Sequence, residues 1–383
     1  MAVLPVDDKR SRRAFHQLPW TIYHEDPAWV PPLLLERREH VSQRNPYFAH
    51  AEAKFWIAYR NEKPVGRISA QIDQLYLESY KDGTGFFGML EAENDPQVFQ
   101  ALFSTVEVWL RQQGMQQIRG PFNLSVNEEC GLLVEGFATA PMVMMGHARP
   151  YYASLVEAQG YQPVKDMFAY IMDSVFETPP FMEKVLARLG AGIRIRPLQR
   201  SRFDEEMETL RDIFNDAWSE NWGFLPFTPA EFRHVASTLK LLVDDDFVQI
   251  AEVDGVPAAM IVVFPNVNEA IRDLNGRVWP FGWAKLLWRL KVAYPKTARI
   301  PLMGVRKRFQ RTPLGIALAY AVIHAVRAPG AKRQVERVEM SWILEDNVGM
   351  RSILNSLGAH PYKRYCLYEK SLKGVSNHSN LCQ

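Results

Sequence analysis

Four cationic residues stand within six positions of the sequence, directly before an apolar helical pattern. The stretch RKRFQRTPLGIA, residues 306–317, follows the strand-like run IPLMGV and leads into LAYAVIHAV. The first turn of a helix carries unpaired N–H groups and the positive end of the helix dipole, so it attracts anions. Lysine and arginine side chains add charge-assisted hydrogen bonds to phosphate oxygens. The pattern predicts a diphosphate-binding turn, although a solvated basic loop before a core helix would carry the same charges.

Several residues of this turn suit the binding of an anion. Thr312 is of a type that caps helices, and Pro313 is tolerated in a first turn because its missing N–H is not needed there. Gly315 would let a ligand approach the backbone closely, and Ala317 keeps the next turn small. We therefore expect the turn from 312 to 317 to contact the ligand.

The elements around this turn form a strand–helix–strand unit. Apolar runs predict strands at about 298–305 and 336–343, and the intervening helix is apolar on several faces from 313 to about 326. A right-handed crossover of this kind makes the two strands parallel neighbours in one sheet. Similar patterns predict further strands of the second half at about 193–198, 247–253, 257–264 and 364–370.

The chain also repeats itself weakly, at a spacing of just under 200 residues. FWIAYRNEKPVGRISAQI at 55–72 resembles FVQIAEVDGVPAAMIVVF at 247–264, and each reads as a β-hairpin. In a later pair of matching segments, Gly160 corresponds to Gly358. Chance likeness between two α/β segments is the alternative. The repeat predicts similar domains at 1–185 and 186–372 and a disordered tail at 373–383.

Composition excludes several classes of protein. The net charge is +2, so we expect no nucleic-acid partner bound through overall charge. The cysteines Cys130, Cys366 and Cys382 are far apart, which fits a reducing compartment and offers no metal-site spacing. We find no signal-peptide pattern and no apolar run of about 18 residues that would span a membrane. The expectation is a cytoplasmic protein without a bound metal.

Taken together, these patterns resemble the GNAT superfamily of acyl-CoA N-acyltransferases. The family signature is a strand, Gln/Arg-x-x-Gly-x-Gly/Ala opening a helix, a second strand, a helix headed by asparagine, and a closing strand. Gln310 and Arg311 precede TPLGIA, one residue further from the glycine than in the family pattern when counted from Arg311. VEMSWILEDNVGMRSILNSLGAHPYKRYCLYEK is similar to the closing part and places Asn347 at the head of its helix.

The resemblance implies a fold and a donor. Each domain would be a mixed, mostly antiparallel sheet flanked by helices, with one parallel strand pair that splays apart. Acetyl-CoA or a longer acyl-CoA would lie in that V, with pantetheine held by the backbone of Met303 and Val305 and by Asn347. Many members protonate the departing thiolate with a tyrosine, but Leu354 occupies its place here. The resemblance implies no metal.

The first half lacks the predicted phosphate turn. After its strand GFFGML come Glu91, Glu93 and Asp95, whose charges would repel phosphate. We expect this half to have lost the donor and to contribute packing and part of the acceptor site. Asn123, Asn127 and Glu128 could supply polar groups near the joint between the two halves. The alternative is that they are only turn residues.

A long insertion, residues 265–297, separates the second hairpin from the strand before the turn. Trp283, Leu286, Leu287 and Leu290 share one face of its predicted helix, opposite two cations. Such a composition is typical of helices that lie on lipid, so it predicts peripheral contact with the inner membrane surface through 279–294. Packing into the domain or into a partner subunit is the alternative.

The acceptor is expected to be a small-molecule or lipid amine. The insertion and the phrases ENWGF, PNVNE and SWILEDN resemble bacterial tandem GNAT proteins that include ceramide synthases, which acylate long-chain bases. Amine attack needs a group that removes a proton. The candidate bases are Glu269, preferred for its place beside the insertion, Glu220 and Glu345. A non-catalytic acyl-CoA-binding or membrane-docking protein and a tRNA-dependent aminoacyl transferase remain alternatives.

Overall fold

A computed structural model describes residues 1–187, 190 and 192–373 of the 383-residue chain. Cys382 and the predicted tail beyond Lys373 lie outside the described residues. In the first half the strands are β1 (Ala2–Pro5), β2 (Ala51–Arg60), β3 (Lys63–Asp73), β4 (Thr84–Ala92), β5 (Gln117–Gly120), β6 (Leu132–Glu135) and β7 (Gln162–Asp173). The helices are α1 (Lys9–Ile22), α2 (Leu34–His40), α3 (Gln74–Tyr80), α4 (Pro96–Gln112), α5 (Tyr152–Glu157) and α6 (Pro180–Leu186).

The second half repeats this order of elements. Its strands are β8 (Ile193–Pro197), β9 (Val248–Val253), β10 (Val256–Pro265), β11 (Thr297–Val305), β12 (Arg337–Leu344) and β13 (His360–Ser371). Its helices are α7 (Phe203–Trp218), α8 (Pro229–Leu242), α9 (Val267–Ile271), α10 (Gly282–Lys291), α11 (Pro313–Ala325), α12 (Arg327–Lys332) and α13 (Val348–Ser356). Short 3-10 turns cover Pro46–Ala49, Arg200–Arg202, Asp245–Phe247 and Lys307–Phe309.

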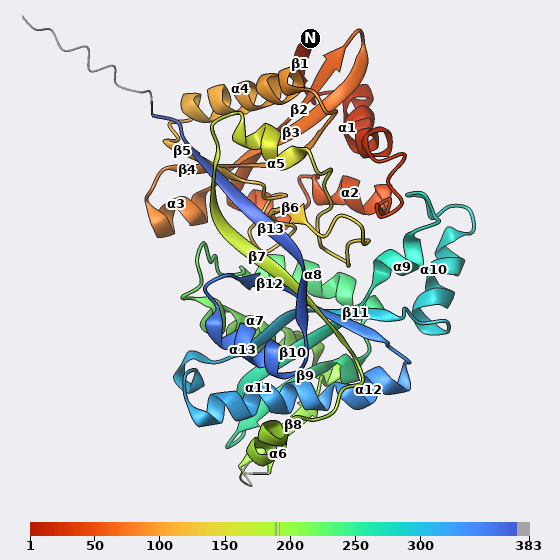
Figure 1. Ribbon diagram of the computed structural model, residues 1–383, viewed down its shortest axis with the longest axis vertical. Helices are drawn as coiled ribbons and strands as arrows, with labels where there is room; N and C mark the ends of the chain where they lie inside the picture. The colour runs from red at the N-terminus through yellow and green to blue at the C-terminus, as the bar shows by residue number, and fades with distance from the viewer. Residues whose placement is uncertain (188–189, 191, 374–383) are drawn as a thin grey trace, which may run out of the picture.

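One sheet of thirteen strands runs through the described part of the chain (Figure 1). Its order is β1-β2-β3-β4-β5-β13-β7-β12-β11-β10-β9-β8, and β6 pairs with β13. Only the pairs β4–β5 and β11–β12 are parallel among the described strands. The predicted mixed, mostly antiparallel sheet with helices on its faces is therefore confirmed.

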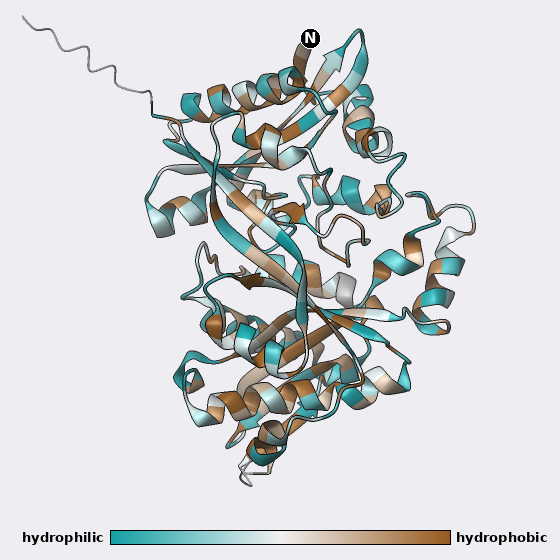
Figure 2. Ribbon diagram, viewed as in Figure 1, coloured by the Kyte–Doolittle hydropathy of each residue, from teal (hydrophilic) through white to brown (hydrophobic). Residues whose placement is uncertain are grey.

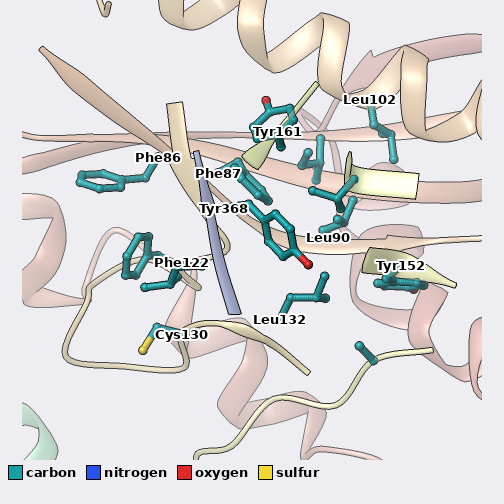
Figure 3. Close-up of a cluster of buried hydrophobic side chains, with 14 of the residues drawn as sticks. Phe86, Phe87, Leu90, Leu102, Phe122, Cys130, Leu132, Tyr152, Tyr161 and Tyr368 are labelled. Atoms are coloured by element: carbon teal, nitrogen blue, oxygen red, sulfur yellow. The ribbon is translucent and has the colours of Figure 1, made fainter. Parts of the chain in front are cut away.

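The two halves exchange their last strands. β7, from the first half, pairs with β12, and Arg337 lies opposite Asp173. β13, from the second half, pairs with β5, and Tyr368 lies opposite Gly120. Figure 3 shows Tyr368 among aromatic and apolar side chains of the first half, including Phe87. Each half of the chain thus supplies a strand to the other half's part of the sheet, and each depends on the other for its core. The division into domains at 1–185 and 186–372 stays a prediction.

Helix α11 is the central helix of the second half. It is buried on most sides, as its apolar pattern predicts, and Leu318 and Val322 are fully inaccessible to solvent. Figure 2 shows hydrophobic residues along α11 and the strands near it. In the described residues, Pro313–Lys332 is the one helical stretch whose length and composition would allow it to cross a membrane, and half of its most apolar window is buried in the protein.

A histidine joins the two halves beside α8. The Nδ1 of His50 lies 3.1 Å from Asp73, and its Nε2 lies 3.1 Å from Glu231 on α8. Burial alone would lower the pKa of His50, but hydrogen bonds to both carboxylates outweigh it and raise that pKa to about 9. The charged imidazolium therefore stabilises the contact between α8 and the first half.

Replacing His50 with glutamine should make stability less dependent on pH. The folded pKa is raised, so the stabilisation is complete below the ordinary histidine pKa and is lost as pH rises through about 9. After discounting for solvent, we expect His50→Gln to lower the free energy of unfolding by about 1–2 kcal/mol at pH 6. Urea unfolding at pH 6 and pH 10 measures this, and an equal loss at both values would contradict it.

Candidate functional site

The parallel strands β11 and β12 separate halfway along their length. Their paired residues end at Ile300 and Met340, although β11 continues to Val305 and β12 to Leu344. The pairing of β12 with β7 also shifts just after Met340, where Trp342 has a φ of 61°. The predicted splayed pair is therefore present, and it opens a gap in the sheet.

Backbone groups of β11 face this gap. The N–H of Arg306 donates to the carbonyl of Ala258 on β10 at 2.8 Å. Because backbone groups alternate in direction along a strand, those of Met303 and Val305 point away from β10 toward the gap. The carbonyl of Val305 accepts from Nε2 of Gln310 at 2.8 Å, which ties the following loop to the strand. The groups left facing the gap can bind an extended ligand.

A cavity of about 1120 Å³ occupies the gap and continues on both sides of the sheet. This volume exceeds the range of about 300–1,000 Å³ that is usual for small-molecule sites. On one side it is lined by Met303, Val305, Gln310, Arg311, Gly315 and Asn347. On the other it runs between α7, α8 and β10, among the apolar residues Met207, Leu210, Phe214, Phe232, Ala236 and Phe264. The site thus has a polar end and a long apolar end.

The turn before α11 is held by contacts within the chain. Oγ1 of Thr312 accepts from the N–H of Gly315 at 3.1 Å and donates to the carbonyl of Phe309 at 2.6 Å. A Cβ on Gly315 would lie 2.0 Å from that carbonyl, so the chain itself requires glycine here, with or without a ligand. The predicted close approach of a ligand to Gly315 stays a prediction. The first-turn N–H of Leu314 has no partner within the helix and can still face an anion.

The four cations of the turn have different surroundings. Arg306 donates to Asp212 on α7, and Lys307 pairs with Glu220 at 2.9 Å. The guanidinium of Arg308 lies 4.6 Å from the ring centre of Phe309. Arg311 is exposed, lines the cavity, and has a left-handed φ of 58° with no ionic partner among the described residues. Of the four, Arg308 and Arg311 thus have no carboxylate partner among the described residues, and Arg311 is the one that lines the cavity.

The helix α13 presents Asn347 to the cavity. Its Oδ1 accepts from the N–H of Met350 at 3.1 Å and caps the helix, and its amide N–H groups have no partner in the part of the chain described. Leu354, at the family's tyrosine position, is buried in the core and does not line the cavity. Tyr320 does line it, with its hydroxyl 2.8 Å from Oγ of Ser356, and sequence reasoning missed this residue.

The three candidate bases lie in different places. Glu220 lines the cavity at its exposed end, and the hydrogen bond from Lys307 lowers its pKa. Glu345 does not line the cavity and lies 3.5 Å from Lys165. The carboxylate of Glu269 accepts from the N–H groups of Lys296, at 2.9 Å, and Thr297, at 3.0 Å, and is also outside the cavity.

The geometry therefore gives no support to Glu269 as the base. Its three hydrogen bonds, one from Oγ1 of Thr297, close the ends of the insertion onto each other. None of the described lining residues comes from 265–297, so the insertion does not line this cavity. Of the described residues, no three or more histidine, cysteine or acidic side chains form a group that could hold a metal.

A buried charged pair lies just below the gap, and sequence reasoning missed it. Arg299 and Glu339 are opposite each other on β11 and β12, and both are fully buried. Nε of Arg299 donates to Ser341 at 2.6 Å, and its guanidinium lies 4.0 Å from the ring centre of Trp342. Burial lowers the pKa of Arg299 and raises that of Glu339. The pair lies one position before Ile300 and Met340, the last residues at which the two strands are paired. The sequence indicated it only through one charged residue inside each apolar strand.

The equivalent gap in the first half is closed by the chain itself. The N–H of Phe122 donates to the carbonyl of Phe87 at 2.8 Å, and Oδ1 of Asn123 accepts from the N–H of Met89 at 2.7 Å. A Cβ on Gly88 would lie only 1.7 Å from the carbonyl oxygen of Phe122. This half therefore has no opening for a ligand between β4 and β5.

The other polar residues predicted at the joint are divided between two places. Asn127 lines the cavity of the second half and donates to the carbonyl of Leu225 at 3.1 Å. Glu128 instead pairs with His40 at 2.6 Å. The first half thus supplies part of the cavity wall through Asn127.

Comparison with known proteins gives two close relatives. The chain is 50% identical over 366 residues to Protein YghO of Escherichia coli (strain K12), covering 95% of this chain and 94% of that protein. It is 47% identical over 375 residues to the bacterial ceramide synthase of Caulobacter vibrioides, covering 97% and 98%. No protein-family model matches the chain.

Solved structures show the same fold at low sequence identity. A tandem GNAT protein from the clavulanic acid biosynthesis pathway has a TM-score of 0.57 and 14% identity, covering 97% of this chain and 98% of that one. A GCN5-related N-acetyltransferase from Sphaerobacter thermophilus has a TM-score of 0.53 and 14% identity, covering 97% and 96%. The architecture is therefore that of tandem GNAT proteins.

Proposed function

Because this chain belongs to the family of tandem GNAT-fold proteins that includes Protein YghO and the bacterial ceramide synthase, we propose that it is an N-acyltransferase that uses a fatty acyl-CoA. One observation carries the proposal. The gap between β11 and β12 joins a cationic turn on one side of the sheet to an apolar cavity on the other. A thioester with a charged head and a long apolar chain matches that arrangement.

The described residues suit each part of this donor. Arg308, Arg311 and the first turn of α11 would hold the diphosphate, and Asn347 with the backbone of Met303 and Val305 would hold pantetheine. The acyl chain would lie between α7 and α8. Burial of each methylene group contributes about 0.8 kcal/mol, so the apolar end favours a long chain over acetyl.

The reaction joins an amine nitrogen to the thioester carbonyl carbon and releases a thiol. The carbon–sulfur bond breaks, the thiolate takes a proton, and the attacking amine must lose one. The carboxylates among the described lining residues are Glu220 and Asp346, and each pairs with a lysine at 2.9 Å. An apolar cavity lowers the pKa of a bound ammonium group by desolvation. We infer that this desolvation supplies the neutral amine.

The acceptor we propose is a long-chain amine. The name of the relative from Caulobacter vibrioides describes ceramide synthesis, and a ceramide is an N-acylated long-chain amine. The apolar lining from α7 and α8 supports such an acceptor as well as a fatty donor. The second candidate, a protein that binds acyl-CoA without reaction, is favoured by Leu354 at the position of the family's acid.

Turnover with defined substrates separates these functions. The purified full chain is incubated with palmitoyl-CoA and a long-chain 2-amino alcohol, and both the free thiol and the amide are measured. We expect amine-dependent thiol release and an amide of matching mass. If palmitoyl-CoA binds but no amine is converted to an amide, the result would support the non-catalytic function. Acyl transfer only from aminoacyl-tRNA would support a tRNA-dependent aminoacyl transferase.

A further inference from the structure

The segment 279–292 exposes large apolar side chains to solvent. We call residues 266–296, which contain α9 and α10, the aromatic lobe. Figure 1 shows α9 and α10 at one edge of the molecule, away from α11 and α13. Trp279 is 77% exposed and Phe281 is 80% exposed. The other large apolar residues exposed on this segment are Trp283, Leu287, Trp288 and Val292.

The polar contacts of the lobe explain why these side chains face outward. Arg289 and Lys285, on α10, both pair with Asp273, which follows α9. Arg289 also donates to the carbonyl of Ala270 at 2.8 Å. Leu290 is the buried residue of α10. A surface helix ordinarily turns its apolar face inward, whereas α10 is fixed by ion pairs and presents its tryptophans to solvent.

The lobe also carries an excess of positive charge. Residues 265–297 contain six arginine or lysine residues and two carboxylates, whereas the whole chain has a net charge of +2. Arg277 is exposed between Asp273 and Trp279. Aromatic side chains that reach solvent beside an excess of positive charge complement a surface that is both anionic and apolar.

We propose that the aromatic lobe docks the protein on an anionic lipid surface. Tryptophan suits the boundary between head groups and acyl chains because its ring is apolar and its N–H finds a polar partner. A second copy of the chain fits less well, since a symmetric contact through this lobe would place its positive charges against each other. The lobe contributes no residue to the described lining of the cavity, so docking does not depend on the proposed reaction.

Vesicle sedimentation tests the docking directly. The parent chain and the triple variant Trp279→Ser/Phe281→Ser/Trp288→Ser are mixed with vesicles of phosphatidylcholine, with and without phosphatidylglycerol. We expect the parent to bind the anionic vesicles, to lose binding as salt rises, and to exceed the variant by about tenfold or more in partitioning. Val108→Ser, at an exposed apolar position on α4, should bind as the parent does.

Other outcomes would overturn the proposal. Equal partitioning of the parent and the triple variant would show that the lobe does not hold the lipid. No binding of the parent to anionic vesicles would exclude a lipid surface as the partner. Light scattering that shows a dimer of the parent and a monomer of the variant, with no vesicle binding, would assign the lobe to a second copy. All these readouts are independent of turnover, so failure of the proposed reaction would leave them unchanged.

Discussion

Replacing Ala236 with phenylalanine should lower kcat/KM for palmitoyl-CoA by about 100-fold and leave a short-chain acyl-CoA nearly unaffected. Ala236 lies on α8, is 1% exposed, and lines the apolar end of the cavity. A ring at this position would exclude about four methylene groups of a long chain. At about 0.8 kcal/mol for each methylene, the loss is about 3 kcal/mol in the transition state, or about 100-fold in rate.

A series of acyl-CoA chain lengths measures this effect with an internal control. The graded variant Ala236→Val should shift the preferred length by less than Ala236→Phe. Overpacking a core destabilises a protein by about 1–3 kcal/mol, so the melting temperature is recorded for both variants. An unchanged chain-length profile in both variants would contradict an acyl chain between α7 and α8.

The double variant Arg308→Glu/Arg311→Glu should bind CoA about 100-fold more weakly than the parent. A hydrogen bond to a charged group contributes about 1.5–3 kcal/mol, and two such bonds correspond to about 100-fold or more in Kd. Arg311 lines the cavity, Arg308 lies over the ring of Phe309, and both side chains lack a carboxylate partner among the described residues. Removing them should therefore leave the fold intact. Calorimetric titration with CoA measures the change.

Two comparisons make this result specific to phosphate. Arg38→Glu, at an exposed arginine on α2, should bind CoA like the parent. Pantetheine, which carries no diphosphate, should bind the parent and the double variant equally. If CoA binds the double variant as tightly as the parent, the turn before α11 does not hold the diphosphate.

Much of the fold could be predicted because its patterns are local. The hairpin at 55–72 is β2 and β3, and the helix expected from 313 to about 326 is α11, at Pro313–Ala325. The exchange of β7 and β13 could not be predicted. These strands are the matching segments of an internal repeat, so each has an apolar pattern that suits either sheet. Which partner each strand takes is decided by tertiary packing.

The sequence predicted only part of the site. The order of strand, cationic turn and apolar helix located the polar end, and Asn347 followed from the family resemblance. The partners of Arg306 and Lys307 lie on or next to α7, roughly 90 residues earlier, and no local pattern indicates them. The apolar end depends on how α7 and α8 cover β10, which periodicity does not specify. Glu269 was preferred as the base for its place beside the insertion, but neither Glu269 nor the insertion lines the cavity.

The most direct measurement is an experimental structure of the full chain with a non-hydrolysable palmitoyl-CoA analogue. We predict that its diphosphate contacts Arg311, that its pantetheine lies between Met303 and Asn347, and that its acyl chain passes Ala236 between α7 and α8. An analogue bound elsewhere, or an acyl chain directed into solvent with the α7–α8 cavity empty, would contradict this assignment.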